Sequence, residues 1–365
     1  MATPITGAIS FNDINTALGI ASGTAISLND TSVKQLLNQT SGAVDMNSAH
    51  ACASVNTTTT NLNVFTGLFA SNSTVTTYKV LIPSTVNVGC TTGNTALTLG
   101  QFATGSTIVL NNYGTISGYG GTGGTSGVGN SGGDAINANY ANQTVTINNQ
   151  TGAIIRGGGG GGGKGGTGGT GGSGGTGVYY YTASLGSTPD SAPYTVTGCD
   201  QQCVAIYGQG YCVSGCVGYG TKFGPVYGCR GYCGYTAAAY VGGAGGGAGG
   251  AGGSGGRGQG YDGAAAAGST GAGGSGGGNN GGNSGTGGTG GTGGTGGTGA
   301  SYGAAGSTGS TGNTGGTGAG GNAGGGSGGS AGATGSAGGA SGRYLVKGAN
   351  SVTLNNSGTV SGGLA

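Results

Sequence analysis

The residues best suited to chemistry lie between residues 178 and 241, where six of the eight cysteines and eleven of the 18 tyrosines are found. The six cysteines form three pairs, and three residues separate the members of each pair: Cys199 and Cys203, Cys212 and Cys216, Cys229 and Cys233. Cysteines at this spacing can bind structural zinc as thiolates, or they can be oxidised to disulfides.

Disulfides are the favoured interpretation of these pairs. A small insertion with almost no aliphatic core needs covalent cross-links, each of which stabilises a fold by about 2 to 4 kcal/mol. Zinc is the alternative, but the chain has only His50 as an imidazole ligand, and the commoner spacing of two residues is absent. The sequence does not choose among the possible pairings, and Cys52 and Cys90 are either a separate pair or free thiols.

The aromatic residues of this segment indicate a contact surface for a macromolecule. Tyrosine on a Gly- and Ser-rich loop offers a large amphipathic area with few rotatable bonds, as in antibody binding loops. Some of these side chains are expected to form a small core of the insertion itself. The candidates for contact are Tyr179, Tyr180, Tyr181, Tyr194, Tyr207, Tyr211, Tyr219, Phe223, Tyr227, Tyr232, Tyr235, Tyr261 and Tyr302. The last two belong to residues 257–268 and 300–306, which we expect to be neighbouring loops at the same end.

Catalysis is not expected. The chain has one histidine, no glutamate and seven scattered aspartates, so no acid and base pair, metal triad or nucleophile constellation is evident. The G-x-G-x-x-G matches follow from composition alone, because no strand and helix flank them. We therefore predict a protein that is not an enzyme, with no cofactor and no metal.

Charge and hydropathy exclude further classes. Charged residues are 4% of the chain and the formal net charge is +2, with no cluster of Lys or Arg, so nucleic-acid binding is not expected. No apolar run is long enough to cross a membrane, and the first ten residues lack the basic start and apolar core of a signal peptide. Assembly in the cytoplasm of a cell, followed by release through lysis, would reconcile this start with disulfides.

Glycine-rich tracts flank the insertion on both sides in the sequence, and we expect them to position it. Residues 157–177 and 281–299 have Gly at two of every three positions, with Thr, Ser or Asn mostly at the third. A period of three matches the polyproline II conformation, and the 103 Gly against 5 Pro exclude collagen. We predict packed polyglycine II helices joined by backbone hydrogen bonds; a flexible linker is the alternative.

Two internal repeats lie outside these tracts. In residues 8–19 and 25–37, Ser10 and Ser27 each precede an aspartate by three residues, which predicts two short capped helices, the first ending at Gly19. A β-branched run followed by Asn-Asn recurs in residues 106–118, 143–157 and 350–362. These copies predict strands and turns that stack into a β-helix-like platform.

The chain is therefore expected to be mostly β and irregular, in four regions. Residues 1–54 form a small helical attachment segment, and 55–157 form the platform together with a first glycine-rich excursion. Residues 158–342 form a polyglycine II sandwich that carries the distal insertion 178–241, and 343–365 return to the platform.

The order of these motifs resembles a known group. The segments ISFND (9–13) and ISLND (26–30) resemble N-terminal attachment motifs of tailed-bacteriophage tail fibre and tail tip proteins. The run TALTLGQFATGSTIVLNNYGTISGYGGTGG (95–124), with the later Asn-Asn repeats and glycine tracts, is similar to glycine-rich phage receptor-binding adhesins. The cysteine-rich insertion departs from that pattern.

This resemblance implies a virion protein of the phage tail that acts outside the cell. It implies that distal loops on a polyglycine II sandwich bind a host outer-surface receptor, protein or glycan. Other tail or baseplate proteins would be partners. A homotrimer is expected at least through the N-terminal region, and a monomeric tip on a trimeric fibre is the alternative. Two other classes remain open from the sequence, a glycine-rich structural cell-surface protein and an ice-binding polyglycine II protein.

Overall fold

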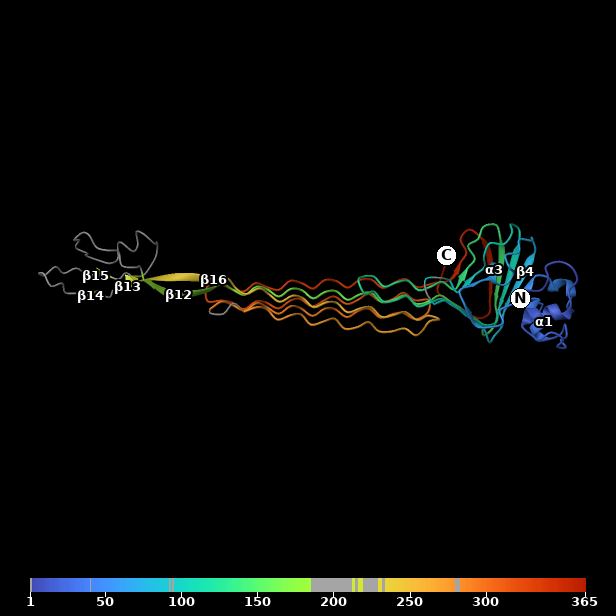
Figure 1. Cartoon of the computed structure of the whole chain (residues 1–365), viewed down its shortest axis with the longest axis horizontal. Coiled ribbons are helices and arrows are strands. Elements are labelled where there is room, and N and C mark those ends of the chain that lie inside the picture. Colours follow the sequence, from blue (N-terminus) through green and yellow to red (C-terminus); the bar gives the residue numbers. More distant parts are fainter. Residues whose placement is uncertain are drawn as a thin grey trace.

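The computed structural model shows an elongated molecule with a β-rich platform at one end, a long glycine bundle, and a β-ribbon at the other end (Figure 1). It describes residues 2–39, 41–91, 93, 95–184, 212–213, 216–218, 229–231, 234–279 and 283–365. The described part of the chain is mostly β and irregular, with few helices, as expected from the sequence.

The platform is a three-sided stack of parallel strands. Its first sheet has the order β1 (Cys52–Ser54), β4 (Thr77–Ile82), β7 (Thr107–Asn112), β10 (Thr144–Asn149) and β18 (Ser351–Asn356). Its second has β2 (Thr59–Thr60), β5 (Asn87–Gly89), β8 (Thr115–Ser117), β11 (Ile154–Arg156) and β19 (Thr359–Ser361). Its third has β3 (Leu62–Asn63), β6 (Leu97–Thr98), β9 (Ile136–Asn137), β17 (Arg343–Val346) and β20 (Gly363–Leu364). The chain visits the three sheets in turn, one strand each, so successive turns form the rungs of a parallel β-helix.

The Asn-Asn repeats lie in register in this stack, which confirms the stacking predicted from the sequence. Strand β10 pairs with β7 and with β18 over six residues on each side. Asn149 is buried, accepts from Asn112 Nδ2 and donates to Asn356 Oδ1, both at 2.8 Å. The inward-facing Ile, Leu and Val of each rung form one continuous core. The amide ladder satisfies the polar groups at the turn, while the apolar columns supply the burial.

A small helical region covers part of the first sheet. Helix α1 (Phe11–Leu18) starts at Ser10, whose side chain and Asp13 form a reciprocal capping box, and it ends at Gly19 with a φ of 73°. Helix α2 (Thr31–Leu36) begins later than expected, because Asp30 Oδ2 accepts from the backbone of Ser27 in a turn that precedes the helix. Residues Met46–Ala49 form a 3₁₀ turn, and α3 (Val64–Gly67) is a single turn elsewhere in the platform.

The glycine bundle leaves one corner of the platform, between the second and third sheets. Its central segment, residues 157–177, runs outward from β11. The other segments are residues 118–127, 128–134, 242–260, 264–278, 284–300, 304–319 and 325–342. Consecutive residues of the central segment donate to three different neighbours: Gly159 to Gln259, Gly160 to Ala304 and Gly161 to Asn130. The first two of these series continue with every third residue along the bundle, and the third ends with the bond from Lys164 to Gly127.

The run of seven glycines in residues 157–163 marks the most crowded part of the bundle. All seven are buried, because the hairpin 118–134 covers the side of the central segment that is exposed farther out. A Cβ on Gly161 would lie 2.1 Å from Thr122 O. Lys164, the first side chain after the run, donates its backbone N–H to Gly127 at the tip of that hairpin. The hairpin therefore ends where the third position of the triplet becomes free to carry a side chain.

Candidate functional site

The far end of the bundle continues into an antiparallel ribbon. Strands β12 (Gly177–Ser184) and β16 (Gly234–Val241) pair from Gly177 opposite Val241 to Ser184 opposite Gly234. Strand β13 (Cys212–Val213) adds to β16, and β14 (Cys216–Gly218) pairs with β15 (Cys229–Gly231). The ribbon forms where the glycine period gives way to the β-forming run VYYYTAS, and it lies at the opposite end from the platform (Figure 1).

Four of the predicted contact residues lie on this ribbon. Tyr179, Tyr180 and Tyr181 lie on β12 and Tyr235 lies on β16, where the structure describes only the backbone. The remaining distal aromatics lie outside the described residues: Tyr194, Tyr207, Tyr211, Tyr219, Phe223, Tyr227 and Tyr232. Tyr240 on β16 is 73% exposed and was not among the predicted contact residues. Its position beside the ribbon root places an aromatic surface at the base of the tip.

The cysteines divide into two groups. Cys52 and Cys90 are buried free thiols, and burial raises the pKa of Cys52 to about 12 and that of Cys90 to about 11. Cys212, Cys216 and Cys229 lie on β13, β14 and β15, whose side chains are not described. Cys199, Cys203 and Cys233 lie outside the described residues. The disulfides of the insertion therefore stay a prediction.

The root of the ribbon is held by two turns of the bundle. Val178 is 7% exposed, and its N–H donates to Asn322 Oδ1 at 2.6 Å. Its carbonyl accepts from Asn322 Nδ2 at 2.8 Å and from Asn283 Nδ2 at 3.0 Å. Asn322 N–H in turn donates to Asn283 O, which ties the two turns to each other. Sequence analysis missed these residues, although each asparagine lies where the glycine triplets are interrupted.

Tyr261 and Tyr302 lie at the platform end of the bundle, so the expectation that they belong to distal loops is wrong. A Cβ on Gly89 of β5 would meet the Tyr261 ring at 2.0 Å, and Tyr261 N–H donates to Gly118 O. The Tyr302 ring stacks over the Arg156 guanidinium, whose Cζ lies 3.6 Å from the ring centroid. Successive passes of the bundle run in opposite directions, so every second turn lies at the platform end. The sequence alone did not reveal the direction of each pass.

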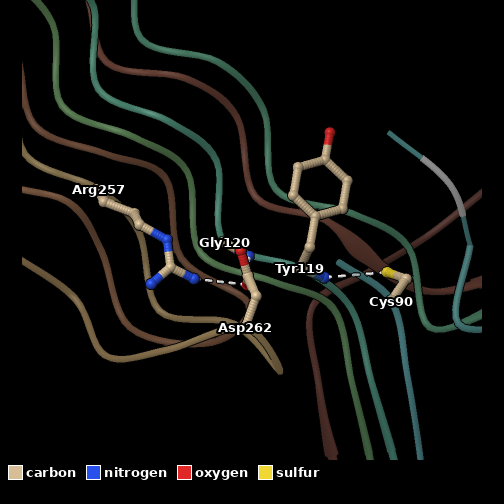
Figure 2. Close-up of polar contacts among 5 residues, drawn as sticks. All are labelled: Cys90, Tyr119, Gly120, Arg257 and Asp262. Carbon is tan, nitrogen blue, oxygen red and sulfur yellow. Dashed lines mark hydrogen bonds and ion pairs between the residues drawn. The ribbon is translucent and has the colours of Figure 1, made fainter. Parts of the chain in front are cut away.

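These proximal turns form a polar joint between bundle and platform (Figure 2). Asp262 forms an ion pair with Arg257, and its Oδ1 also accepts from Gly120 N at 2.9 Å. Beside it, Tyr119 N–H donates to the Cys90 thiol at 3.1 Å. The interactions connect the hairpin 118–134, the turn 260–263 and Cys90, the residue that follows strand β5, so they hold the base of the bundle against the platform.

The bundle between this joint and the ribbon carries no charge. Beyond Lys164, residues 165–177, 242–256 and 264–342 contain no Asp, Glu, Lys, Arg or His. Among the described residues, no group of three or more His, Cys, Asp or Glu could hold a metal ion. A search of the same residues finds no helix that is long and apolar enough to cross a membrane.

Comparison with known proteins finds one family. The family model described as phage tail fibre adhesin Gp38 matches residues 49–272. A solved structure, the gp37-gp38 adhesin tip complex of the bacteriophage S16 long tail fibre, is 18% identical in sequence with a TM-score of 0.34. The match covers 99% of this chain and 100% of that chain. No curated protein sequence matches this chain significantly.

Proposed function

We propose a division of labour for this chain from the premise that it belongs to the phage tail fibre adhesin Gp38 family, whose members bind the host surface. The protein is thus a virion component that recognises a host receptor, and the cell-surface and ice-binding alternatives are set aside. In our proposal the ribbon end contacts the receptor, the bundle acts as a stalk, and the platform end attaches to the tail. We further propose that the chain is not an enzyme; the description of its family as an adhesin supports this, as does the scatter of titratable residues in the sequence.

The stalk is proposed to be a sandwich of polyglycine II helices. Support comes from the bonding pattern, in which the same neighbour receives a hydrogen bond from every third residue. A period of three residues per turn produces this pattern in a left-handed extended helix. Further support comes from the glycines, because a Cβ on Gly165, Gly168 or Gly171 would lie within 2.1 Å of a neighbouring carbonyl oxygen. The side-chain-free backbone allows the close approach that the bonds require.

The host-binding surface is proposed to comprise the aromatic residues of 178–241, stapled by disulfides among the six cysteines of that segment. The observation that carries this proposal is the location of the ribbon at the free end of an uncharged, hydrogen-bonded stalk (Figure 1). Tyr240 and the turns that contain Asn283 and Asn322 extend the surface. Tyr261 and Tyr302 are excluded from it by their position at the joint.

The opposite end is proposed to dock on other tail proteins. Residues 1–54, whose last three form β1 of the first sheet, supply the attachment segment. Residues 55–157, with the hairpin 118–134 as a first glycine-rich excursion, supply the platform together with 343–365, and residues 158–342 form the stalk and tip. Phe11 on α1 is 45% exposed and gives this end an apolar contact point. A homotrimeric fibre is the proposed partner, and the particle would be assembled in the host cytoplasm and act outside it.

Deletion of residues 185–233, with the ends of β12 and β16 joined by a short turn, tests the proposal. Particles that carry the deletion should assemble normally but lose adsorption to host cells. A variant with the exposed mid-stalk residue Thr311 replaced by alanine serves as the control and should adsorb like the parent. Undiminished adsorption of the deletion particles would refute the assignment of the tip. Peptide mapping without reduction would reveal whether the six distal cysteines are paired.

A further inference from the structure

The last hydrogen bonds of the stalk are made by side chains instead of backbone. Along the central segment, Gly169 donates to Asn313 O, Gly172 to Gly316 O and Gly175 to Ala319 O. Each step advances three residues on both segments. At the next step Val178 donates to the side-chain Oδ1 of Asn322, at the same separation in sequence. The side-chain amide of Asn322 therefore replaces a backbone peptide group at the position where its segment turns away.

Asparagine is chemically suited to this replacement. Its side chain carries one carbonyl and one NH₂ group, so it reproduces the acceptor and the donor of a peptide unit. Asn322 uses both groups on the same residue, accepting from Val178 N and donating to Val178 O, which belong to two successive peptide groups. Asn283 supplies a second donor to that carbonyl. A carboxylate has no donor and could satisfy only half of the arrangement.

The proximal end of the stalk shows the simpler case. There Asp262 Oδ1 accepts from Gly120 N, and Asp134 Oδ1 accepts from Arg343 N at 2.7 Å. At both of these positions a backbone N–H needs only an acceptor, and the carboxylate of an aspartate provides it. The two ends thus follow one chemical rule, in which polar side chains complete the backbone bonds that the turns leave open.

We propose that Asn283 and Asn322 are the positioning residues of the host-binding tip. They bind both backbone polar groups of Val178, which is the first residue after the glycine triplets and the second residue of β12. Because β12 and β16 are paired from this point, the orientation of the two peptide groups that flank the Val178 Cα sets the direction in which the ribbon leaves the stalk. This inference rests on the proposed host-binding role of the ribbon, and it concerns how that ribbon is held and not what it contacts.

The test compares three variants of the full chain. Asn322→Ala removes the acceptor and one donor, and Asn322→Asp keeps the acceptor but removes the donor. Asn313→Ala is the matched control, since Asn313 lies on the segment that leads into the turn of Asn322 and its side chain bonds to Thr292 Oγ1 instead of to the ribbon. Hydrogen exchange is measured for the Val178 amide, for the ribbon amides, and for Gly172 and Gly288 in the stalk. Adsorption is measured with particles that carry each variant.

In Asn322→Ala we expect the Val178 amide to exchange about tenfold faster, as the loss of one net hydrogen bond implies. The ribbon amides should also exchange faster, Gly172 and Gly288 should be unchanged, and adsorption should fall severalfold. Asn322→Asp should keep the Val178 N–H protected while the ribbon amides exchange faster. Asn313→Ala should change none of these quantities.

Two results would overturn the inference. If adsorption falls in Asn322→Ala without faster exchange at Val178, then Asn322 touches the receptor directly, and the host-binding role stands without the positioning role. If exchange rises but adsorption is unchanged, the direction of the ribbon does not matter for host binding. Failure of the host-binding proposal itself would appear separately, as normal adsorption after deletion of residues 185–233.

Discussion

Replacing one buried glycine of the stalk by alanine should destabilise it, whereas the same replacement at an open glycine should not. A Cβ on Gly168 would lie 1.9 Å from Gly291 O, although real Cβ atoms essentially never come within 3.0 Å of such an atom. A Cβ on Gly328 would meet nothing within 4 Å. Neither residue has a positive φ, so alanine is compatible with both backbones.

The cost at Gly168 follows from the bonds around Gly291. Gly291 O accepts from Gly250 N at 2.8 Å, and Gly291 N donates to Gly169 O at 2.8 Å. A retreat of Gly291 by roughly 1 Å, enough to relieve the contact, stretches such bonds beyond the usual range of about 2.7 to 3.2 Å. Each lost bond costs about 1 kcal/mol, and a buried group left unpaired costs about 1 to 3 kcal/mol. We expect Gly168→Ala to destabilise the stalk by about 2 to 4 kcal/mol.

Hydrogen exchange of the stalk amides, with thermal unfolding followed by circular dichroism, measures this difference. In Gly168→Ala the amides of Gly250 and Gly291 should exchange at least about 30-fold faster, and melting should shift to lower temperature. Gly328→Ala should be neutral or stabilising by about 0.4 to 1 kcal/mol, because alanine restricts the unfolded chain. Equal behaviour of the two variants would refute the close packing on which the stalk depends.

Three further predictions concern the platform and the joint. Replacing the buried Asn149 by alanine should lower the free energy of unfolding by about 2 to 3 kcal/mol, because it leaves the side chains of Asn112 and Asn356 without their partner. The control Asn148→Ala, at a half-buried position, should cost less. Iodoacetamide at pH 8 should not label Cys52 or Cys90 until the protein is unfolded, since both thiols have a pKa raised by burial to about 11 or 12. The neutral form of both thiols is favoured in the folded state, so the melting temperature should fall as the pH rises from 9 towards 11. Labelling of the native protein would contradict the burial on which both expectations rest. Tyr302→Ala should weaken the joint by about 0.5 to 1 kcal/mol through loss of the contact with Arg156, and electron microscopy should then show a wider spread of angles between stalk and platform.

The repeats of the platform were predictable because they are local patterns. Strand pairing puts Asn111, Asn148 and Asn355 in one row, and the matching sequence copies indicate that row directly. The Ser10 cap of the first helix was predictable for the same reason. Ser27 was predicted to cap the second helix, but its backbone bonds Asp30 before the helix begins, and spacing alone does not distinguish the two geometries.

The arrangement of the stalk was harder to predict. The period of three indicates the local conformation, but not which segments are neighbours or where each one turns. Tyr261 and Tyr302 were therefore expected at the wrong end. The signal that could have placed them is the run of glycines in 157–163, which marks the base of the stalk because only a fully surrounded segment requires Gly at all three positions of its triplet.

The shared three-residue register restricts how such a stalk can change in length during evolution. Inserting a single residue into one segment would rotate every later side chain by about 120°, which turns threonines towards carbonyl oxygens that tolerate no Cβ. Only whole triplets preserve the faces, and the central segment must lengthen together with the passes that surround it. Indels should therefore accumulate at the turns, while the passes between them change in steps of three.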